Sequence, residues 1–218
     1  MDARIDDAFE AFFSRFKELQ YRRGEIIIRA DDPPLGVFCL NEGFIRQYVI
    51  SEKGSEIILD VIKPITIFPL SWAVNNLPNS SFYEAITLTK ARRAPREEFL
   101  AFIKGDREIL FSLLSLSLDN ADRFLAHTAH VLASSVYTRL VEELIAHAKR
   151  LGKKGKANSY TFEFKVIERG IAGIVGSTPE TVSRELKVLK EKGLIAFDNN
   201  MLTVNDMVKL ENELLGGY

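Results

Sequence analysis

Residues 171–186 read IAGIVGSTPETVSREL, which predicts two short amphipathic helices joined by a glycine-containing turn. The second helix has a start signal. The Thr178 side chain can accept a hydrogen bond from a free backbone N–H, and Pro179 fills the first helical position, where no N–H is needed. Two helices joined in this way form a helix-turn-helix, a unit that docks into the major groove of DNA.

The second helix divides into an apolar stripe and a polar stripe. Val182, Leu186 and Leu189 recur at i, i+4, i+7 spacing, so we expect them to pack inward. The stripe that then faces outward holds Glu180, Ser183, Arg184 and Lys187.

The types of side chain on this polar stripe suit the reading of bases. The guanidinium of Arg184 presents a planar fork to O6 and N7 of guanine, and the Glu180 carboxylate can accept from the cytosine amino group. One turn apart, the two could read a single G·C pair, and Ser183 would reach the neighbouring base. The predicted DNA-binding residues are Thr178, Pro179, Glu180, Ser183, Arg184 and Lys187.

The alternative is a solvated polar face on an ordinary helical bundle. The segment that follows weighs against it. Gly193 to Phe197 and Met201 to Val204 predict two short strands around the Asp198-Asn199-Asn200 turn, and such a hairpin forms the wing of a winged helix.

The whole chain predicts an α+β fold in three parts. A first part, 1–105, begins with a helix at roughly residues 4 to 19. It continues with β-branched and aromatic residues cut by turn residues, which indicates an antiparallel β-roll. A second part, 106–135, is a long helix that ends in the plausible hinge Ala133-Ser134-Ser135. The third part, 136–218, is the winged helix-turn-helix domain.

The long helix carries a seam at 4-3-4-3-4 spacing, as in a two-stranded coiled coil. The seam consists of Leu114, Leu118, Ala121, Leu125, Thr128 and Leu132. A second stripe could cover the roll, and it consists of Leu113, Leu116, Phe124 and Val131. Two apolar faces favour a parallel homodimer, although a roll that covers both stripes of a monomer is the alternative.

Composition limits the remaining possibilities. The 218 residues carry a net charge of −1, so DNA contacts would have to be local, through Arg184, Lys187, Lys190 and Lys192. The apolar runs fall short of a membrane span and the N-terminus is too polar for a secretion signal, so we expect a cytoplasmic protein with no membrane partner. The single cysteine, Cys39, is expected to be a buried apolar thiol.

Four segments together resemble the Crp/Fnr family, the catabolite-activator-like bacterial transcription factors, over essentially the whole chain. YRRGEII (21–27), VFCLNEGFIR (37–46) and KGSEIIL (53–59) are similar to its cyclic-nucleotide-binding-like β-roll, and Gly176 to Arg184 is similar to its recognition element. Glu180, Ser183 and Arg184 match the pattern with which the Fnr branch reads TTGA half-sites. The resemblance implies a TTGA, spacer, TCAA palindrome in double-stranded DNA, and RNA polymerase as a further partner.

The effector region departs from the family's patterns. Cyclic-nucleotide-binding members carry a Gly-Glu pair and an Arg-Ser-Ala run, whereas here IFPLSW (67–72) and NSSFYEA (79–85) contain neither the pair nor the arginine. Without that counter-charge, cyclic AMP and cyclic GMP are not expected. An iron–sulfur cluster is not expected either, because Cys39 stands alone. Haem would depend on His127 and His130, which are more typical of surface or interface residues, and no metal site is predicted.

An apolar effector pocket between the roll and the long helix is a further hypothesis, with plain core packing as its alternative. Its candidate lining is Phe68, Leu70, Trp72, Phe82, Tyr83, Glu84, Phe124 and His127. The effector itself is not identified by the sequence.

The sequence leaves three functions to weigh. The leading one is a homodimeric DNA-binding regulator whose roll senses a signal, and the second keeps DNA binding but has no effector. The third is a cupin-like β-barrel enzyme, which would need metal-binding histidines on strands, yet His127, His130 and His147 all fall in predicted helices. No catalytic residue and no enzymatic activity are therefore predicted.

Overall fold

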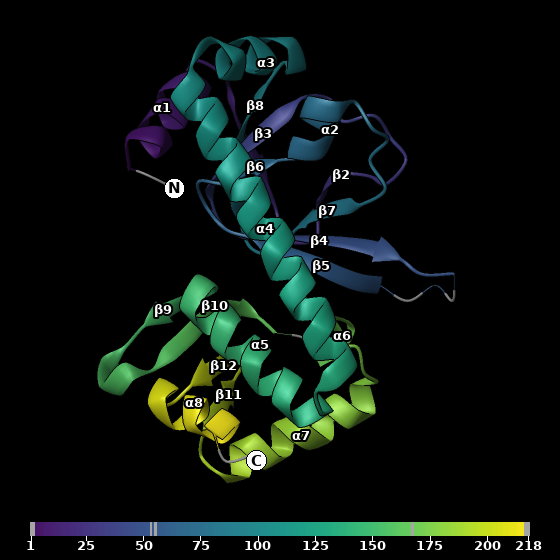
Figure 1. Cartoon of the computed structure of the whole chain (residues 1–218), viewed down its shortest axis with the longest axis vertical. Coiled ribbons are helices and arrows are strands. Elements are labelled where there is room, and N and C mark those ends of the chain that lie inside the picture. The colour runs from purple at the N-terminus through teal and green to yellow at the C-terminus, as the bar shows by residue number, and fades with distance from the viewer. Residues whose placement is uncertain (1–2, 53, 55, 167, 216–218) are drawn as a thin grey trace. The chain divides into compact units, whose positions relative to one another are not determined.

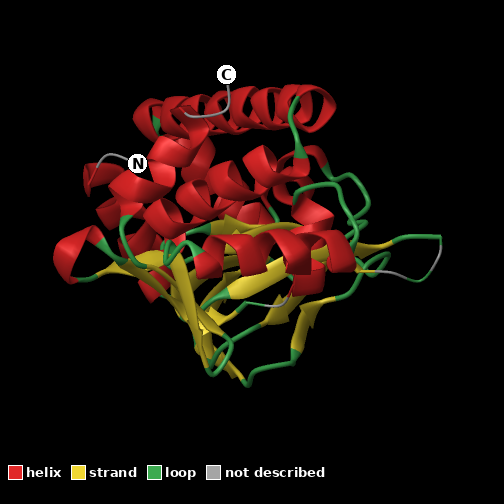
Figure 2. Cartoon of the chain, turned by 90° about the horizontal axis from the view of Figure 1, so that it is seen from below, coloured by secondary structure: helices red, strands yellow, loops and turns green. Residues whose placement is uncertain are grey.

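The computed structural model describes residues 3–52, 54, 56–166 and 168–215. The chain divides into two compact units, residues 1–49 with 59–125, and residues 50–58 with 126–218. Both units combine helices with antiparallel strands (Figures 1 and 2). The first unit therefore includes most of the long helix, whereas the sequence predicts that helix as a separate part.

The strands of the roll form two four-stranded sheets, with the orders β1-β8-β3-β6 and β2-β7-β4-β5. The pairings of β1 with β8, β3 with β6 and β8, and β7 with β2 and β4 are antiparallel, as predicted. The strands are β1 Glu18–Tyr21, β2 Ile26–Ile28, β3 Val37–Glu42, β4 Ile45–Ile50, β5 Glu56–Ile62, β6 Ile67–Phe68, β7 Phe82–Ala85 and β8 Thr89–Ala94.

Four helices accompany the roll: α1 Ala3–Ser14, α2 Leu70–Asn75, α3 Arg96–Gly105 and α4 Arg107–Ala133. The first helix is shorter than predicted. Glu18 and Leu19, expected at its end, instead belong to β1 with Gln20 and Tyr21 and pair with β8, Glu18 opposite Arg92. The backbone hydrogen bonds of this segment are thus made with partners 68 to 74 residues further along the chain, which the local sequence cannot show.

Two apolar clusters form the core of this unit. Phe9 and Phe13 of α1 pack with Phe99 of α3 and Leu113 of α4 in one cluster. The roll interior forms the second, with members that include Phe38, Leu40, Ile45, Phe68 and Tyr83. Cys39 is buried in the first cluster as predicted, and burial raises the pKa of its thiol to about 11, so the thiol stays protonated and unreactive near neutral pH.

The second unit contains a four-stranded sheet of order β11-β12-β10-β9 (Figure 1). Leu140, Val141 and Leu144 of its first helix are buried in the core. Its elements are α5 Val136–Leu151, β9 Gly152–Lys154, the short 3-10 helix η1 Lys156–Asn158, β10 Tyr160–Lys165, α6 Glu168–Ile174, α7 Pro179–Glu191, β11 Ile195–Asp198, β12 Met201–Val204 and α8 Met207–Leu215. Among the helices of the described residues, none combines the length and the apolar character that crossing a membrane requires.

Candidate nucleic-acid interface

The predicted recognition helix is α7, and it begins where the sequence indicated. The Thr178 hydroxyl oxygen accepts from the backbone N–H of Thr181 at 3.3 Å, which makes Thr178 the N-cap. Pro179 occupies the first turn, where its missing N–H leaves no donor unsatisfied. The start of this helix is thus set by its own first residues.

The two stripes of α7 face opposite environments, as predicted. Val182, Leu186 and Leu189 are 0%, 3% and 0% exposed, so they anchor the helix in the core. On the outer stripe the Glu180, Arg184 and Lys187 side chains are exposed and Ser183 is half-buried. Packing therefore fixes which face of α7 is presented to solvent.

The two cations of the outer stripe are held only loosely within the chain. Arg184 Nη2 donates to the Thr181 hydroxyl at 3.4 Å, near the limit of a hydrogen bond. Lys187 Nζ lies 3.9 Å from a Glu191 carboxylate oxygen, and both side chains are largely exposed. Such contacts are worth little in water, so both cations can exchange them for an anionic partner.

The turn between α6 and α7 depends on a glycine. Gly176 has φ +62°, in the left-handed region that favours glycine, and it directly follows Val175, which is fully buried. The N–H of Ser177 bonds back to the carbonyl of Ala172 at 3.0 Å and closes the end of α6. The chain can then reverse direction and start α7 two residues later.

The predicted wing is also present. Strands β11 and β12 pair with Asp198 opposite Met201. The two residues between them, Asn199 and Asn200, have φ +47° and +65°. This is the left-handed pair that a two-residue hairpin turn requires and that asparagine tolerates.

One of the expected DNA-contacting cations is committed elsewhere. Lys192 Nζ contacts a Glu213 carboxylate oxygen at 2.5 Å and donates to the Tyr137 hydroxyl at 3.0 Å. The hydrogen bond to Glu213 is the main cause that raises the pKa of Lys192. Lys192 was expected to contact DNA together with Lys187 and Lys190, but its ammonium is instead paired with Glu213 of α8.

The predicted seam of α4 lies on the surface of the chain. Leu114, Leu118 and Leu125 are 53%, 58% and 64% exposed, and Ala121 and Thr128 are also exposed. The Leu132 side chain falls outside the described residues. An apolar row left in water along one helix is a surface that a partner helix would cover.

The second stripe of α4 does not cover the roll along its whole length. Leu113 is buried, at 5% exposed, and Leu116 is half-buried, but Phe124 is 70% exposed. The expectation that Phe124 covers the roll is therefore wrong, because only the first turns of α4 pack in the cluster with α1 and α3. The Val131 side chain is not among the described ones.

The candidate effector-pocket residues are distributed over separate environments. Phe68 and Tyr83 stack at 5.3 Å in the roll interior, whereas Leu70 and Trp72 pack against the cluster of α1 and α3. Phe82 stacks on Tyr48 at 5.1 Å, and it cannot share a face with Tyr83 because neighbouring strand residues point to opposite sides. The side chains of His127 and His130, on which haem ligation would depend, lie outside the described part of the chain.

The charged candidate, Glu84, is paired within the roll. Its carboxylate lies 2.7 Å from Arg46 Nη2, and both side chains are only 16% exposed. The guanidinium also lies 4.6 Å from the centroid of the Tyr48 ring. The pair follows from the register, because Arg46 of β4 stands opposite Glu84 of β7.

Asn79 begins the segment 79–85, which contains no arginine. Its side-chain amide donates to the carbonyls of Arg29 at 3.0 Å and Ser81 at 2.7 Å. The amide thus holds the loop before β7 to the strand region around Arg29. Both of its hydrogens are used within the fold.

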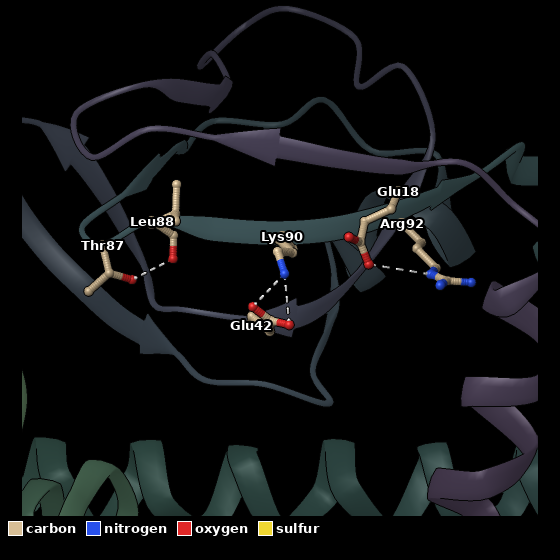
Figure 3. A network of polar contacts seen from close by, with 6 residues as sticks. All are labelled: Glu18, Glu42, Thr87, Leu88, Lys90 and Arg92. Atoms are coloured by element: carbon tan, nitrogen blue, oxygen red, sulfur yellow. Dashed lines mark hydrogen bonds and ion pairs between the residues drawn. The ribbon is translucent and has the colours of Figure 1, made fainter.

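Other ion pairs join neighbouring strands on the surface of the roll (Figure 3). Lys90 lies 2.9 Å from a Glu42 carboxylate oxygen, and Arg92 lies 3.9 Å from Glu18. These residues stand on β8 and its neighbours β3 and β1, so the pairs link adjacent strands. The hydrogen bond that Lys90 donates to the Glu42 carboxylate raises the pKa of Lys90.

The described residues contain no group of three or more His, Cys, Asp or Glu side chains placed to hold a metal ion.

Comparison with known proteins agrees with this architecture. Residues 18–106 match the model of the cyclic nucleotide-binding domain, and residues 138–213 match that of the Crp-like helix-turn-helix domain. The fold and the exposed face of α7 thus define a DNA-binding transcription regulator with a cyclic-nucleotide-binding-type roll. The chain belongs to the Crp/Fnr family.

The relatives are distant but extend over most of the chain. The anaerobic regulatory protein of Pasteurella multocida is 25% identical over 94% of this chain and 73% of its own length. The global nitrogen regulator of a Nostoc species is 25% identical over 88% of this chain and 87% of its own. The solved structure of FixK2 from Bradyrhizobium japonicum is 23% identical in sequence to this chain and superposes on it with a TM-score of 0.76. The match covers 90% of this chain and 96% of the FixK2 chain.

Proposed function

We propose that this regulator acts as a homodimer that reads a palindrome of the form TTGA, spacer, TCAA. The observation that carries the proposal is the outer stripe of α7, where Glu180 and Arg184 are exposed one turn apart on a helix whose other face is sealed in the core. A carboxylate and a guanidinium at this spacing suit the cytosine amino group and the guanine edge of one G·C pair.

A dimer is supported by the exposed seam of α4. Leu114, Leu118 and Leu125 recur at heptad-like spacing and leave a row of apolar surface in water. Two copies joined along this row would be related by a two-fold axis and would present two recognition helices. Such an arrangement reads inverted half-sites, and the regulator would then act on RNA polymerase at the promoter.

For the roll we propose an effector other than a cyclic nucleotide. Arg46, a cation of the roll that is only 16% exposed, already faces Glu84 at 2.7 Å, and Asn79 uses its amide on two backbone carbonyls. A cyclic phosphate that paired with Arg46 would meet the Glu84 carboxylate and would have to break this pair. The second candidate, a regulator without an effector, is favoured by the same filled interior, since Phe68 and Tyr83 are 3% and 5% exposed.

The test is operator binding by the full chain, measured by fluorescence anisotropy on short duplexes at fixed salt. We expect the palindrome to bind about a thousandfold more tightly than a scrambled duplex of equal composition, with two chains per duplex in native mass spectrometry. Equal affinity for both duplexes would contradict the proposal. Added cyclic AMP is expected to leave the affinity unchanged, and a clear rise would refute the effector part alone.

A further inference from the structure

Arg139, near the start of α5, contacts two segments that lie far apart in the sequence. Its Nε donates to the carbonyl of Val175 at 2.7 Å, and its Nη2 lies 3.4 Å from that of Gly176. Its Nη1 donates to the carbonyl of Ser134 at 2.7 Å. One side chain therefore contacts both the hinge before α5 and the turn before α7.

The carbonyls that Arg139 binds lie where backbone acceptors need partners. Val175 and Gly176 follow the last residue of α6, where carbonyl groups have no intrahelical donor and the helix dipole is negative. A guanidinium suits this place, because its planar fork donates to several acceptors at once and keeps its charge. The half-buried position of Arg139 strengthens these bonds relative to bonds in water.

The backbone between α4 and α5, which forms the hinge, is also held by hydrogen bonds. Helix α4 ends at Ala133 and α5 begins at Val136, with the Ser135 hydroxyl accepting from the N–H of Thr138 at 3.1 Å. The N–H of Arg139 bonds to the carbonyl of Ser135 at 3.0 Å. The hinge, the first turn of α5 and the Arg139 side chain thus form one hydrogen-bonded group.

A second set of hydrogen bonds lies at the C-terminal end of the recognition helix. The Tyr137 hydroxyl donates to Glu213 of α8 at 2.5 Å and accepts from Lys192, the C-cap of α7, at 3.0 Å. The ammonium of Lys192 also lies 5.1 Å from the centroid of the Tyr137 ring. The first turns of α5 consequently hold α7 near its start through Arg139 and at its end through Tyr137.

We infer that Arg139 is a positioning residue that ties the orientation of the recognition helix to the hinge. A change in the backbone around Ser134 moves the guanidinium, and the guanidinium carries the Val175-Gly176 turn with it. Because Tyr137 holds the far end of α7, the helix turns as a body rather than bending. This role rests on the proposed function, since orientation matters when two recognition helices must meet half-sites at a set spacing.

The first experiment needs no DNA. Amide hydrogen exchange is measured on the full-length wild type and on the Arg139→Gln variant. Near the hinge it follows the backbone amides of residues 138 and 139, and at the turn it follows those of Val175 and Ser177. We expect exchange to accelerate about tenfold in both segments, because one side chain stabilises both. Arg139→Lys keeps the charge but not the fork and should give a smaller acceleration in both. Faster exchange at the turn alone would overturn the inference, since Arg139 would then only cap α6, and so would no change in either segment.

A matched control removes one positive charge elsewhere in the same unit. Lys209→Gln on α8 serves, because that side chain is 73% exposed and its ion-pair partner, Asp206, is 3.9 Å away. We expect this variant to exchange like the wild type in both segments. Thermal unfolding of each variant establishes that the comparison is made between folded proteins.

The second experiment measures affinity for palindromes whose spacer is lengthened or shortened by one base pair. The wild type should favour one spacer, and Arg139→Gln should lose about fivefold or more of this discrimination while its affinity for a single half-site stays within about twofold. Equal weakening at every spacer would contradict the positioning role. If the wild type binds none of these palindromes, the proposed operator is wrong, and the exchange experiment still decides the role of Arg139.

Discussion

Replacement of Arg184 by alanine is the most direct test of base reading. In the free protein the guanidinium is exposed, with a 3.4 Å contact to the Thr181 hydroxyl. Exposed contacts of this kind contribute little, and alanine favours a helix, so we expect the free energy of unfolding to change by less than about 0.5 kcal/mol. On the cognate duplex a bidentate contact to guanine is worth about 1–3 kcal/mol, which corresponds to about a 5- to 150-fold loss of affinity for each of the two half-sites.

The assay compares Arg184→Ala with the wild type by fluorescence anisotropy on two duplexes, one with TTGA half-sites and one with the guanine replaced. The loss should appear on the first duplex and nearly vanish on the second, because the contact is already missing there. Arg184→Lys, which keeps the charge and loses the fork, should behave like alanine in discrimination but keep more of the overall affinity. An equal loss on both duplexes would refute base reading and would indicate a phosphate contact.

Three further predictions concern the dimer, the core and the acid response. Leu118→Glu, which places a charge on a side chain that is 58% exposed, should shift the protein to monomers in analytical ultracentrifugation while each chain stays folded, and a persistent dimer would contradict the seam. Leu189→Ala, at a fully buried position, should cost about 2–5 kcal/mol in denaturant unfolding, whereas the exposed neighbour variant Lys190→Ala should cost little. The hydrogen bond from Lys192 holds the pKa of Glu213 below its ordinary value of 4.5, so the stability that this carboxylate adds is fully present above pH 4.5 and is lost as the pH falls through the lowered pKa. Glu213→Gln should therefore weaken the acid dependence of unfolding below pH 4.5, and an unchanged dependence would show that the pair contributes nothing.

Local sequence signals predicted the DNA-binding half of the molecule well. The cap at Thr178, the apolar stripe that includes Val182 and the asparagine pair of the wing all appear where the sequence indicated. Each depends on residues within a turn or two of one another. Helix caps, helical periodicity and two-residue hairpins are governed by the backbone and its immediate neighbours, so the chain specifies them without reference to distant segments.

The predictions failed where the answer depended on strand register. Glu18 and Leu19, expected at the end of the first helix, instead pair with β8, and Phe82 and Tyr83, grouped together as pocket lining, face opposite sides of the sheet. The pairing of Arg46 with Glu84 could not be foreseen either, because a shift of one residue would have separated them. Each outcome is decided by which distant strand supplies the hydrogen bonds.

The sequence by itself determined that this chain carries a helix-turn-helix with a wing and which side chains its recognition helix presents. Only the tertiary structure decided how that helix is held, since Arg139 reaches carbonyls 36 and 37 residues away and Tyr137 reaches a carboxylate 76 residues away. The physical reason is the range of the interactions. Caps and stripes arise from neighbours along the chain, whereas a side chain that joins a hinge to a turn finds its partners only after the helices have packed.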